Sequence, residues 1–368
     1  MNTLNSTPDA RRYLNLAARL ALRARGYVEP NPIVGAVLER NGEIIGLGHH
    51  KKYGGLHAET EALADCRAKG NDPRGFTLYV TLEPCNHFGK QPPCSKAIIE
   101  AGIARVVMAR ADLNPVSSGG AEALRQAGIQ IEFTDASPLA THISDPFIKR
   151  ITTGLPWVIV KWAQTADGRL VTRDDEPRWI SNEFSRRQVH RLRARVDAVV
   201  SGIGAVLADD PLLTARHVHV RRVARRVVLD SNLSIPYDSA LVASAGKTPT
   251  LIFCDAEQLA GTSEARAKSI VLASAHVSVQ GIRGRGAHLD LREALGILGT
   301  QYQATNVLIE PGPRLLAAVL AENLADELVV YIAPPAPGEV LQFPGYALSR
   351  RRQLGGDTEV RYRRSSTP

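Results

Sequence analysis

Apolar residues recur at helical spacing in several segments, and short apolar runs typical of strands lie between them. Residues 8–25 carry Leu and Ala at helical spacing and stop at Gly26, which predicts an N-terminal helix. Apolar runs at 33–38 and 44–46 flank Asn41-Gly42 and predict a β-hairpin. The elements expected next are helices at 58–68, 95–101 and 121–127 and strands at 77–82, 106–109 and 129–133.

The alternation of strands and helices starts afresh after a short linker-like segment, Thr152 to Pro156. Strands that alternate with helices favour a layered α/β architecture. We therefore expect two α/β domains, residues 1–150 and 155–368. The tail, residues 338–368, is short and basic, and its patterning is weak. The elements expected in the second domain are helices at 182–195, 290–298 and 314–322 and strands at 157–163, 197–201, 226–230, 250–254, 306–310 and 327–333.

Composition places the chain among ordinary globular proteins. Of its 368 residues 44% are hydrophobic and 22% are charged, which excludes a disordered or collagen-like chain. Four cysteines are too few for a disulfide scaffold, and Cys66 and Cys254 are expected to be buried thiols. No apolar run reaches the ~18 residues of a membrane helix, and the N-terminus lacks a signal-peptide pattern. We expect a cytoplasmic protein that does not bind membranes.

The net charge of +8 admits two kinds of partner, nucleic acid or an anionic small molecule. The arginine clusters at 186–195, 221–226 and 350–352 are short and lie far apart in the sequence. This distribution favours a phosphate-bearing small molecule over a nucleic acid.

A possible metal site stands out in the first half, where His57-Ala58-Glu59 precedes Pro84-Cys85 and Pro93-Cys94. One His and two Cys are ligands that Zn²⁺ prefers, and three protein ligands leave a fourth position open for catalysis. Glu59 lies beside this set and suits a general acid and base. The order resembles the signature of zinc base deaminases, although eight residues, rather than two, separate Cys85 from Cys94. The alternative is a structural or redox cysteine pair.

The second half offers a weaker signal. Gly202-Ile203-Gly204 follows an expected strand but lacks the third glycine of a dinucleotide-binding fingerprint. Glu310 to Arg314 joins an apolar strand to a helix, and such a turn offers backbone N–H groups to a phosphate. An ordinary strand-turn-helix connection explains the same pattern.

The string from Thr81 to Cys94, TLEPCNHFGKQPPC, closely resembles the deaminase half of the bifunctional riboflavin-biosynthesis deaminase/reductase family. Pro30 to Gly35 and Gly48 to His50 are similar to that family too. The resemblance implies a cytidine-deaminase-like three-layer α/β/α domain that uses Zn²⁺ to deaminate a diamino-pyrimidinone ribotide. It also implies substrate contacts at Asn31, His50, His87 and Lys90.

Residues 155–335 resemble the reductase half of the same family, most clearly in Lys161 to Arg169 and in Gly202 to Arg216. The resemblance implies a dihydrofolate-reductase-like domain that reduces the ribosyl group to ribityl with NADPH. Implied cofactor contacts are Ala163, Trp179, Ala205, Asp209, Ser231, Gly312, Pro313 and Arg314. Implied substrate contacts are Lys161, Arg193, Leu213, Arg216 and Glu310.

Some positions depart from the family pattern. Ala205 stands where many relatives have Thr, and Pro177 replaces a Ser that could donate a hydrogen bond. One alternative function is therefore a deaminase whose second domain is a degenerate reductase or an interaction module. A nucleic-acid base deaminase and a zinc-stabilised binding protein without turnover are the others. The resemblance favours a small-molecule enzyme, without a nucleic-acid partner, that forms a homo-oligomer.

Overall fold

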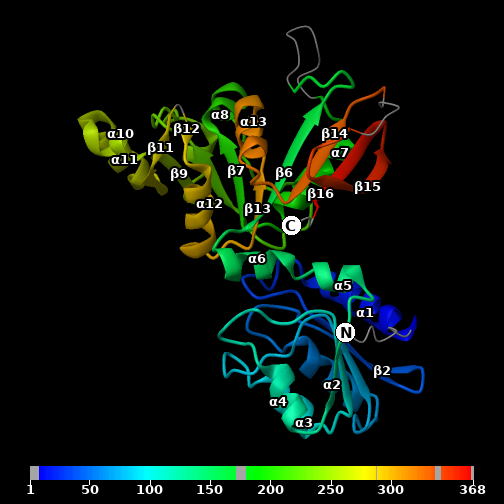
Figure 1. Ribbon diagram of the computed structural model, residues 1–368. Coiled ribbons are helices and arrows are strands. Elements are labelled where there is room, and N and C mark those ends of the chain that lie inside the picture. The colour runs from blue at the N-terminus through cyan, green and yellow to red at the C-terminus, as the bar shows by residue number, and fades with distance from the viewer. Residues whose placement is uncertain (1–7, 171–179, 287, 336–340, 366–368) are drawn as a thin grey trace. The chain divides into compact units, whose positions relative to one another are not determined.

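The computed structural model describes residues 8–170, 180–286, 288–335 and 341–365, and the chain divides into two compact units, Met1–Gly154 and Leu155–Pro368 (Figure 1). Each unit has its own β-sheet and its own hydrophobic clusters. Both are of the α/β class, as the sequence predicts. No helix in the described part of the chain is long and apolar enough to cross a membrane.

The first unit is built on a five-stranded sheet with the order β2-β1-β3-β4-β5. The predicted hairpin is confirmed: β1 and β2 pair antiparallel across Asn41 and Gly42, both with positive φ. β3, β4 and β5 run parallel to one another. The strands are β1 (Gly35–Arg40), β2 (Glu43–His49), β3 (Thr77–Val80), β4 (Arg105–Met108) and β5 (Gln130–Phe133).

Helices cover both faces of this sheet. Because side chains alternate across a strand, Val37 and Tyr79 pack with α1 and α5 on one face, while Leu38 and Leu78 pack with α2, α3 and α4 on the other. The expected three-layer α/β/α domain is confirmed. The helices are α1 (Pro8–Ala21), η1 (Leu22–Ala24), α2 (Ala58–Ala68), α3 (Cys94–Glu100), α4 (Gly120–Gln126), α5 (Pro138–His142) and α6 (Asp145–Thr153).

The second unit is built on a nine-stranded sheet with the order β10-β9-β8-β7-β13-β6-β14-β16-β15. In this order, each strand from β10 across the sheet to β14 runs parallel to its neighbour (β10, β9, β8, β7, β13, β6 and β14). The last strands, β14, β16 and β15, pair antiparallel. The sheet strands are β6 (Trp157–Gln164), β7 (Ala198–Gly202), β8 (Arg225–Leu229), β9 (Thr250–Asp255), β10 (Val277–Ile282), β13 (Asn306–Ile309), β14 (Glu327–Ile332), β15 (Tyr346–Leu354) and β16 (Asp357–Arg364).

One apolar cluster lies on each face of the nine-stranded sheet. The helices of this unit are α7 (Glu183–Arg193), α8 (Ile203–Asp209), α9 (Ala240–Ala243), α10 (Ala256–Gly261), α11 (Ser263–Ser274), α12 (Leu291–Thr300) and α13 (Pro313–Ala321). A two-stranded ribbon joins β11 (Gly284–Arg285) to β12 (His288–Leu289).

The weakly patterned tail contains two strands, β15 and β16, which form a hairpin that extends the sheet. The hairpin buries charge as well as apolar groups. Glu359 is fully buried, and its carboxylate accepts hydrogen bonds from Arg352 and Arg361. The charged residues therefore hide the strand pattern in the sequence.

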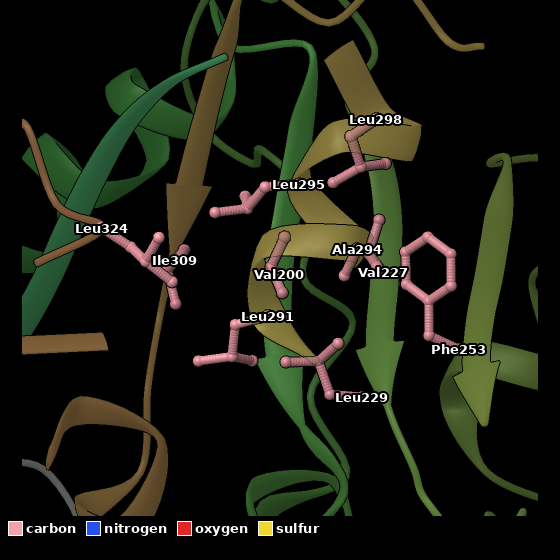
Figure 2. Close-up of a pocket in the computed structure, with 10 residues that line it drawn as sticks. All are labelled: Val200, Val227, Leu229, Phe253, Leu291, Ala294, Leu295, Leu298, Ile309 and Leu324. Atoms are coloured by element: carbon pink, nitrogen blue, oxygen red, sulfur yellow. The ribbon is translucent and has the colours of Figure 1, made fainter. Parts of the chain in front are cut away.

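A gap of about 10 Å³ lies between α12 and the sheet (Figure 2). This volume has room for about one water molecule. The lining is apolar throughout, so the gap is a small packing defect and not a ligand site. Its lining residues are Val200, Val227, Leu229, Phe253, Leu291, Ala294, Leu295, Leu298, Ile309 and Leu324.

Candidate active sites

Three side chains from separate segments of the first unit converge on one point. His57 directly precedes α2, Cys85 lies in the loop after β3, and Cys94 is the first residue of α3. His57 Nδ1 is 3.5 Å from Cys85 Sγ and 3.3 Å from Cys94 Sγ. Ligands held ~2.0–2.3 Å from a tetrahedral zinc stand ~3.5 Å apart. The donor set and its spacing therefore fit a zinc ion.

Two glycines allow the segments that carry these ligands to approach the rest of the unit. A Cβ on Gly48 of β2 would lie 2.0 Å from the carbonyl oxygen of Ala58. A Cβ on Gly120 would lie 1.8 Å from the carbonyl oxygen of Pro84. The first turn of α2 and the residue before Cys85 thus both depend on close backbone contacts that a side chain would prevent.

Glu59 lies in the first turn of α2 with only 3% of its surface exposed. Burial, aided by the nearby Cys85 thiolate, raises the pKa of its carboxyl group to about 7. Such a group is close to half-protonated near neutral pH, so it can accept a proton and give it back. Glu59 is not part of the three-ligand cluster.

The two cysteines differ in their ionisation. A hydrogen bond with Cys94 lowers the pKa of the Cys85 thiol, although burial opposes the shift, and His57 lowers it further. The backbone N–H of Cys94 also donates to Cys85 Sγ over 3.4 Å. Cys85 is thus the first thiolate of the pair, the form that binds a metal.

Asn31 and His50 lie beside the ligand cluster. His50 Nδ1 is 2.8 Å from the carbonyl oxygen of Leu56 and must donate there, so its Nε2 accepts from the Asn31 amide over 3.3 Å. The His50 ring centroid is 5.2 Å from that of His57, and burial lowers the pKa of His50. The histidine is therefore neutral, with its tautomer fixed by the Leu56 carbonyl.

The segment between the two cysteines contacts the loop before α2. Lys90 Nζ lies 3.9 Å from the centroid of the Tyr53 ring, and Gln91 Nε2 donates to the carbonyl oxygen of Gly54 over 3.1 Å. His87 Nδ1 is buried without a hydrogen-bond partner among the described residues. The sequence reasoning missed Tyr53, because nothing local links it to a residue far along the chain.

The second candidate site lies at the carboxyl ends of neighbouring parallel strands. Glu310 follows β13, and Lys161 lies in the second half of β6; the residues directly before them, Ile309 and Val160, pair in the sheet. Parallel strands end at the same edge of a sheet, where α/β proteins bind ligands. This edge gathers the candidate reductase residues from distant parts of the sequence.

A buried ion pair defines this edge. The Arg193 guanidinium donates to both carboxylate oxygens of Glu310, over 2.5 and 2.8 Å. Burial alone would raise the pKa of Glu310, but Arg193, its hydrogen bonds and Lys161 outweigh it and hold the pKa at about 2. Burial lowers the pKa of Lys161, while Glu310 opposes that shift.

Leu213 and Arg216 lie in the loop after α8. Leu213 is buried, whereas Arg216 is exposed and donates from Nη1 to Thr214 Oγ1 over 3.1 Å. The backbone N of Arg216 is 3.2 Å from His190 Nδ1. Burial, together with Arg193 and Arg216, lowers the pKa of His190 to about 4. His190 could not be singled out from the sequence, where its one signal is its place one helical turn before Arg193.

The candidate cofactor residues follow the same strand ends. Ala163 lies in β6, Ala205 and Asp209 lie in α8 directly after β7, and Ser231 follows β8. Gly312 precedes α13, whose first turn has no side-chain cap, so its N–H groups are available to a phosphate. The residues present thus fit a dinucleotide. Pro313 and Arg314 open α13, and Trp179 and Pro177 lie outside the described residues.

Comparison with known proteins gives both units a family. Residues 7–110 match the cytidine and deoxycytidylate deaminase zinc-binding region, and residues 156–355 match the RibD C-terminal domain. The riboflavin biosynthesis protein RibD of Aquifex aeolicus is 40% identical over 330 residues, which cover 89% of this chain and 88% of the relative. That of Escherichia coli is 38% identical, with 89% and 88% covered.

A solved structure agrees along nearly the whole chain. The deaminase/reductase of Thermotoga maritima has a TM-score of 0.80 at 30% identity and covers 97% of this chain and 99% of its own. The two sites and these matches define a bifunctional enzyme, a zinc-dependent deaminase joined to a reductase. The chain belongs to the RibD family of riboflavin biosynthesis proteins.

Proposed function

We propose that this enzyme catalyses two consecutive steps of riboflavin biosynthesis. The first unit removes an amino group by hydrolysis from a diamino-pyrimidinone ribotide, and the second reduces the ribosyl group of the product to ribityl with NADPH. The observation that carries the proposal is the convergence of His57, Cys85 and Cys94 beside the buried Glu59. The Thermotoga relative is described as a diaminohydroxyphosphoribosylaminopyrimidine deaminase and 5-amino-6-(5-phosphoribosylamino)uracil reductase.

In the first unit, His57, Cys85 and Cys94 would hold the zinc ion. Bound zinc supplies a Lewis acid that lowers the pKa of a water ligand. Glu59 takes up a proton near neutral pH and delivers it to the departing amino nitrogen, which suits its raised pKa. The neutral His50 holds the Asn31 amide nitrogen, and this leaves the Asn31 amide oxygen to accept a hydrogen bond from the pyrimidine.

The segment between Cys85 and Cys94 binds the phosphate end of the substrate in this proposal. Lys90 forms no ion pair with a carboxylate among the described residues, and its ammonium lies over an aromatic face. A cation without an acidic partner suits the ribotide phosphate. His87, in the same segment, is the second residue proposed to contact the substrate.

In the second unit, NADPH supplies the hydride, and the chain positions it and the ribosyl group. The proposed cofactor contacts lie at the strand ends; they are Ala163, Ala205, Asp209, Ser231 and the turn from Gly312 to Arg314. The proposed substrate contacts are Lys161, Arg193, Leu213, Arg216 and Glu310. Among them Arg216 is exposed and can reach the phosphate of the substrate. Trp179 belongs to the cofactor set of the proposal.

The place of the buried Arg193–Glu310 pair argues against the deaminase-only alternative. The pair lies close to Lys161 at the carboxyl ends of the parallel strands, which is the edge where α/β sheets bind ligands. The eight residues between the cysteines argue against a nucleic-acid base deaminase. A homo-oligomer in the cytoplasm, acting on a free ribotide, completes the proposal.

One incubation tests both steps. Zinc-loaded protein is given the diamino-pyrimidinone ribotide and NADPH, and the products are identified by mass spectrometry. A deaminated and reduced product is expected. A deaminated but unreduced product would refute the reductase half, and unchanged substrate would refute the whole proposal. Glu59→Gln is the matched variant, expected to retain zinc and to lose deamination by a factor of about 100 or more.

A further inference from the structure

The loop from Asp210 to His217 has an unusual backbone. Asp210, Leu213 and His217 have φ angles of 41°, 50° and 57°. Side-chain-bearing residues adopt the left-handed region rarely, and they keep it only when their surroundings hold them there. Three such residues within eight positions mean that other contacts determine the shape of this loop.

The first of these contacts is made by Asp210. Its Oδ1 accepts a hydrogen bond from the backbone N–H of Ala240 over 2.8 Å. Ala240 is the first residue of α9, so the carboxylate fastens the start of the loop to the start of this short helix.

The second contact is made by Arg226 of β8, a fully buried arginine. Its guanidinium donates to the carbonyl oxygen of Leu241 over 2.9 Å and to Ser244 Oγ over 2.6 Å, at the end of α9. It also reaches the carbonyl oxygen of Leu212 in the loop, over 3.4 Å. The helix is therefore tied at both ends, and both ties lead to the same loop.

Arg226 is used as a set of donors and not as half of an ion pair. Its further acceptors are the carbonyl oxygen of Thr248 and Thr250 Oγ1, and no carboxylate pairs with it among the described residues. Burial lowers its pKa to about 10. Burying a cation without a counter-ion lowers stability. The hydrogen bonds of Arg226 to three segments offset this cost and connect those segments.

The loop in turn supports the substrate side of the second site. The carbonyl oxygen of Thr214 accepts from Arg193 Nη1 over 3.2 Å, and Arg193 holds Glu310. His190 Nδ1 lies 3.2 Å from the same carbonyl and 3.2 Å from the backbone N of Arg216. A shift of the loop would therefore move the contacts of Arg193 and Arg216.

We propose that Asp210 and Arg226 are positioning residues for the reductase: acting through α9, they fix the backbone of residues 212–216 and so set the affinity for the pyrimidine substrate. The proposal rests on the proposed reductase function. Neither side chain needs to touch the substrate or NADPH for this role.

Steady-state kinetics of the full-length enzyme test the proposal. Asp210→Ala should raise the KM for the deaminated substrate about fivefold at saturating NADPH, because one hydrogen bond that fixes the loop to α9 is lost. The kcat should stay within about twofold, since the hydride-transfer groups are untouched. Asp210→Asn keeps a side-chain oxygen and tolerates positive φ, so it should restore most of the affinity. The deaminase activity of the same chain is the internal control.

Asp238→Ala is the matched variant, because Asp238 is an exposed acidic residue two positions before α9 that forms no hydrogen bond with it among the described residues. It should leave the KM unchanged. An equal rise with Asp210→Ala and Asp238→Ala would mean a charge effect and would overturn the proposal. A fall in kcat as large as the rise in KM, with deamination falling in parallel, would mean general destabilisation and would also overturn the proposal.

Hydrogen–deuterium exchange separates this inference from the proposed function. Asp210→Ala should speed exchange in a peptide covering residues 210–217 and leave a peptide from β13 unchanged. Arg226→Lys, which keeps the charge but offers fewer donors, should do the same. Unchanged exchange in the loop would refute the positioning role. If the wild type fails to reduce the substrate, the proposed function fails, and the exchange measurement still decides the inference.

Discussion

Removing the carboxylate of Glu310 should lower the free energy of unfolding of the second unit, because it leaves the buried Arg193 without its counter-ion. In Glu310→Gln the Arg193 guanidinium keeps its charge but loses the counter-ion that its two hydrogen bonds reach. The side chains of Arg193 and Glu310 are only 11% and 13% exposed, so water replaces little of the lost interaction. The amide of Gln has one acceptor oxygen where the carboxylate has two, and it carries no charge.

The size of the effect follows from the pKa of Glu310. Its folded-state pKa of about 2 lies below the ordinary value of 4.5, and this difference corresponds to about 3 kcal/mol of stability. Because the folded pKa is the lower one, the contribution is fully present above about pH 5 and is lost as the pH falls from 4.5 toward 2. The free energy of unfolding should thus drop by about 3 kcal/mol near neutral pH, and the difference from wild type should shrink in acid.

Tryptophan fluorescence can follow this unit alone. All three tryptophans, Trp157, Trp162 and Trp179, belong to Leu155–Pro368. Urea titration of wild type and Glu310→Gln near neutral pH and near pH 3 gives the two free-energy differences.

Glu293→Gln is the matched control, because Glu293 also pairs with an arginine, but that partner, Arg283, is 77% exposed. Its loss should be below about 1 kcal/mol. The reasoning would be refuted by a Glu310→Gln loss no larger than that of Glu293→Gln. A loss that stayed constant between neutral and acid pH would refute the electrostatic cause.

Three further outcomes are expected. Cys94→Ser should lower the zinc content of purified protein well below one ion per chain, whereas Cys66→Ser, a buried thiol away from the cluster, should leave it unchanged; equal metal contents would contradict the ligand set. Lys90→Met should raise the KM of deamination about tenfold for the phosphorylated substrate, through loss of a charged contact, and barely change it for the dephosphorylated analogue; similar changes for both would remove Lys90 from the phosphate site. Chelation of zinc should abolish deamination and leave NADPH oxidation intact when deaminated substrate is supplied; a parallel loss of both would contradict separate sites.

The strands and helices could be predicted from the sequence where burial is apolar. The central parallel strands of the second unit, such as β6 and β13, are apolar runs because both sheet faces are covered. β15 and β16 were not predicted. In β16 the buried Glu359 pairs with arginines, so apolar and polar residues do not simply alternate along this strand.

The candidate zinc ligands could be predicted from the sequence because their motif is short and chemically distinctive. The pairing of Arg193 with Glu310 was not, since 117 residues separate them and only the order of strands brings them together. The same holds for Tyr53 beside Lys90 and for His190 beside the loop after α8. Contacts set by topology leave no local pattern in the chain.

The separation of the hydrophobic clusters has a genetic consequence. No described cluster mixes residues from the two sides of Gly154, so a core substitution on one side leaves the packing on the other side in place. A cell carrying such a lesion in the second unit would accumulate deaminated, unreduced intermediate, while a lesion in the first would accumulate the starting ribotide. Two alleles of this one gene, each damaged on a different side, could therefore complement one another, as mutations in two separate genes do.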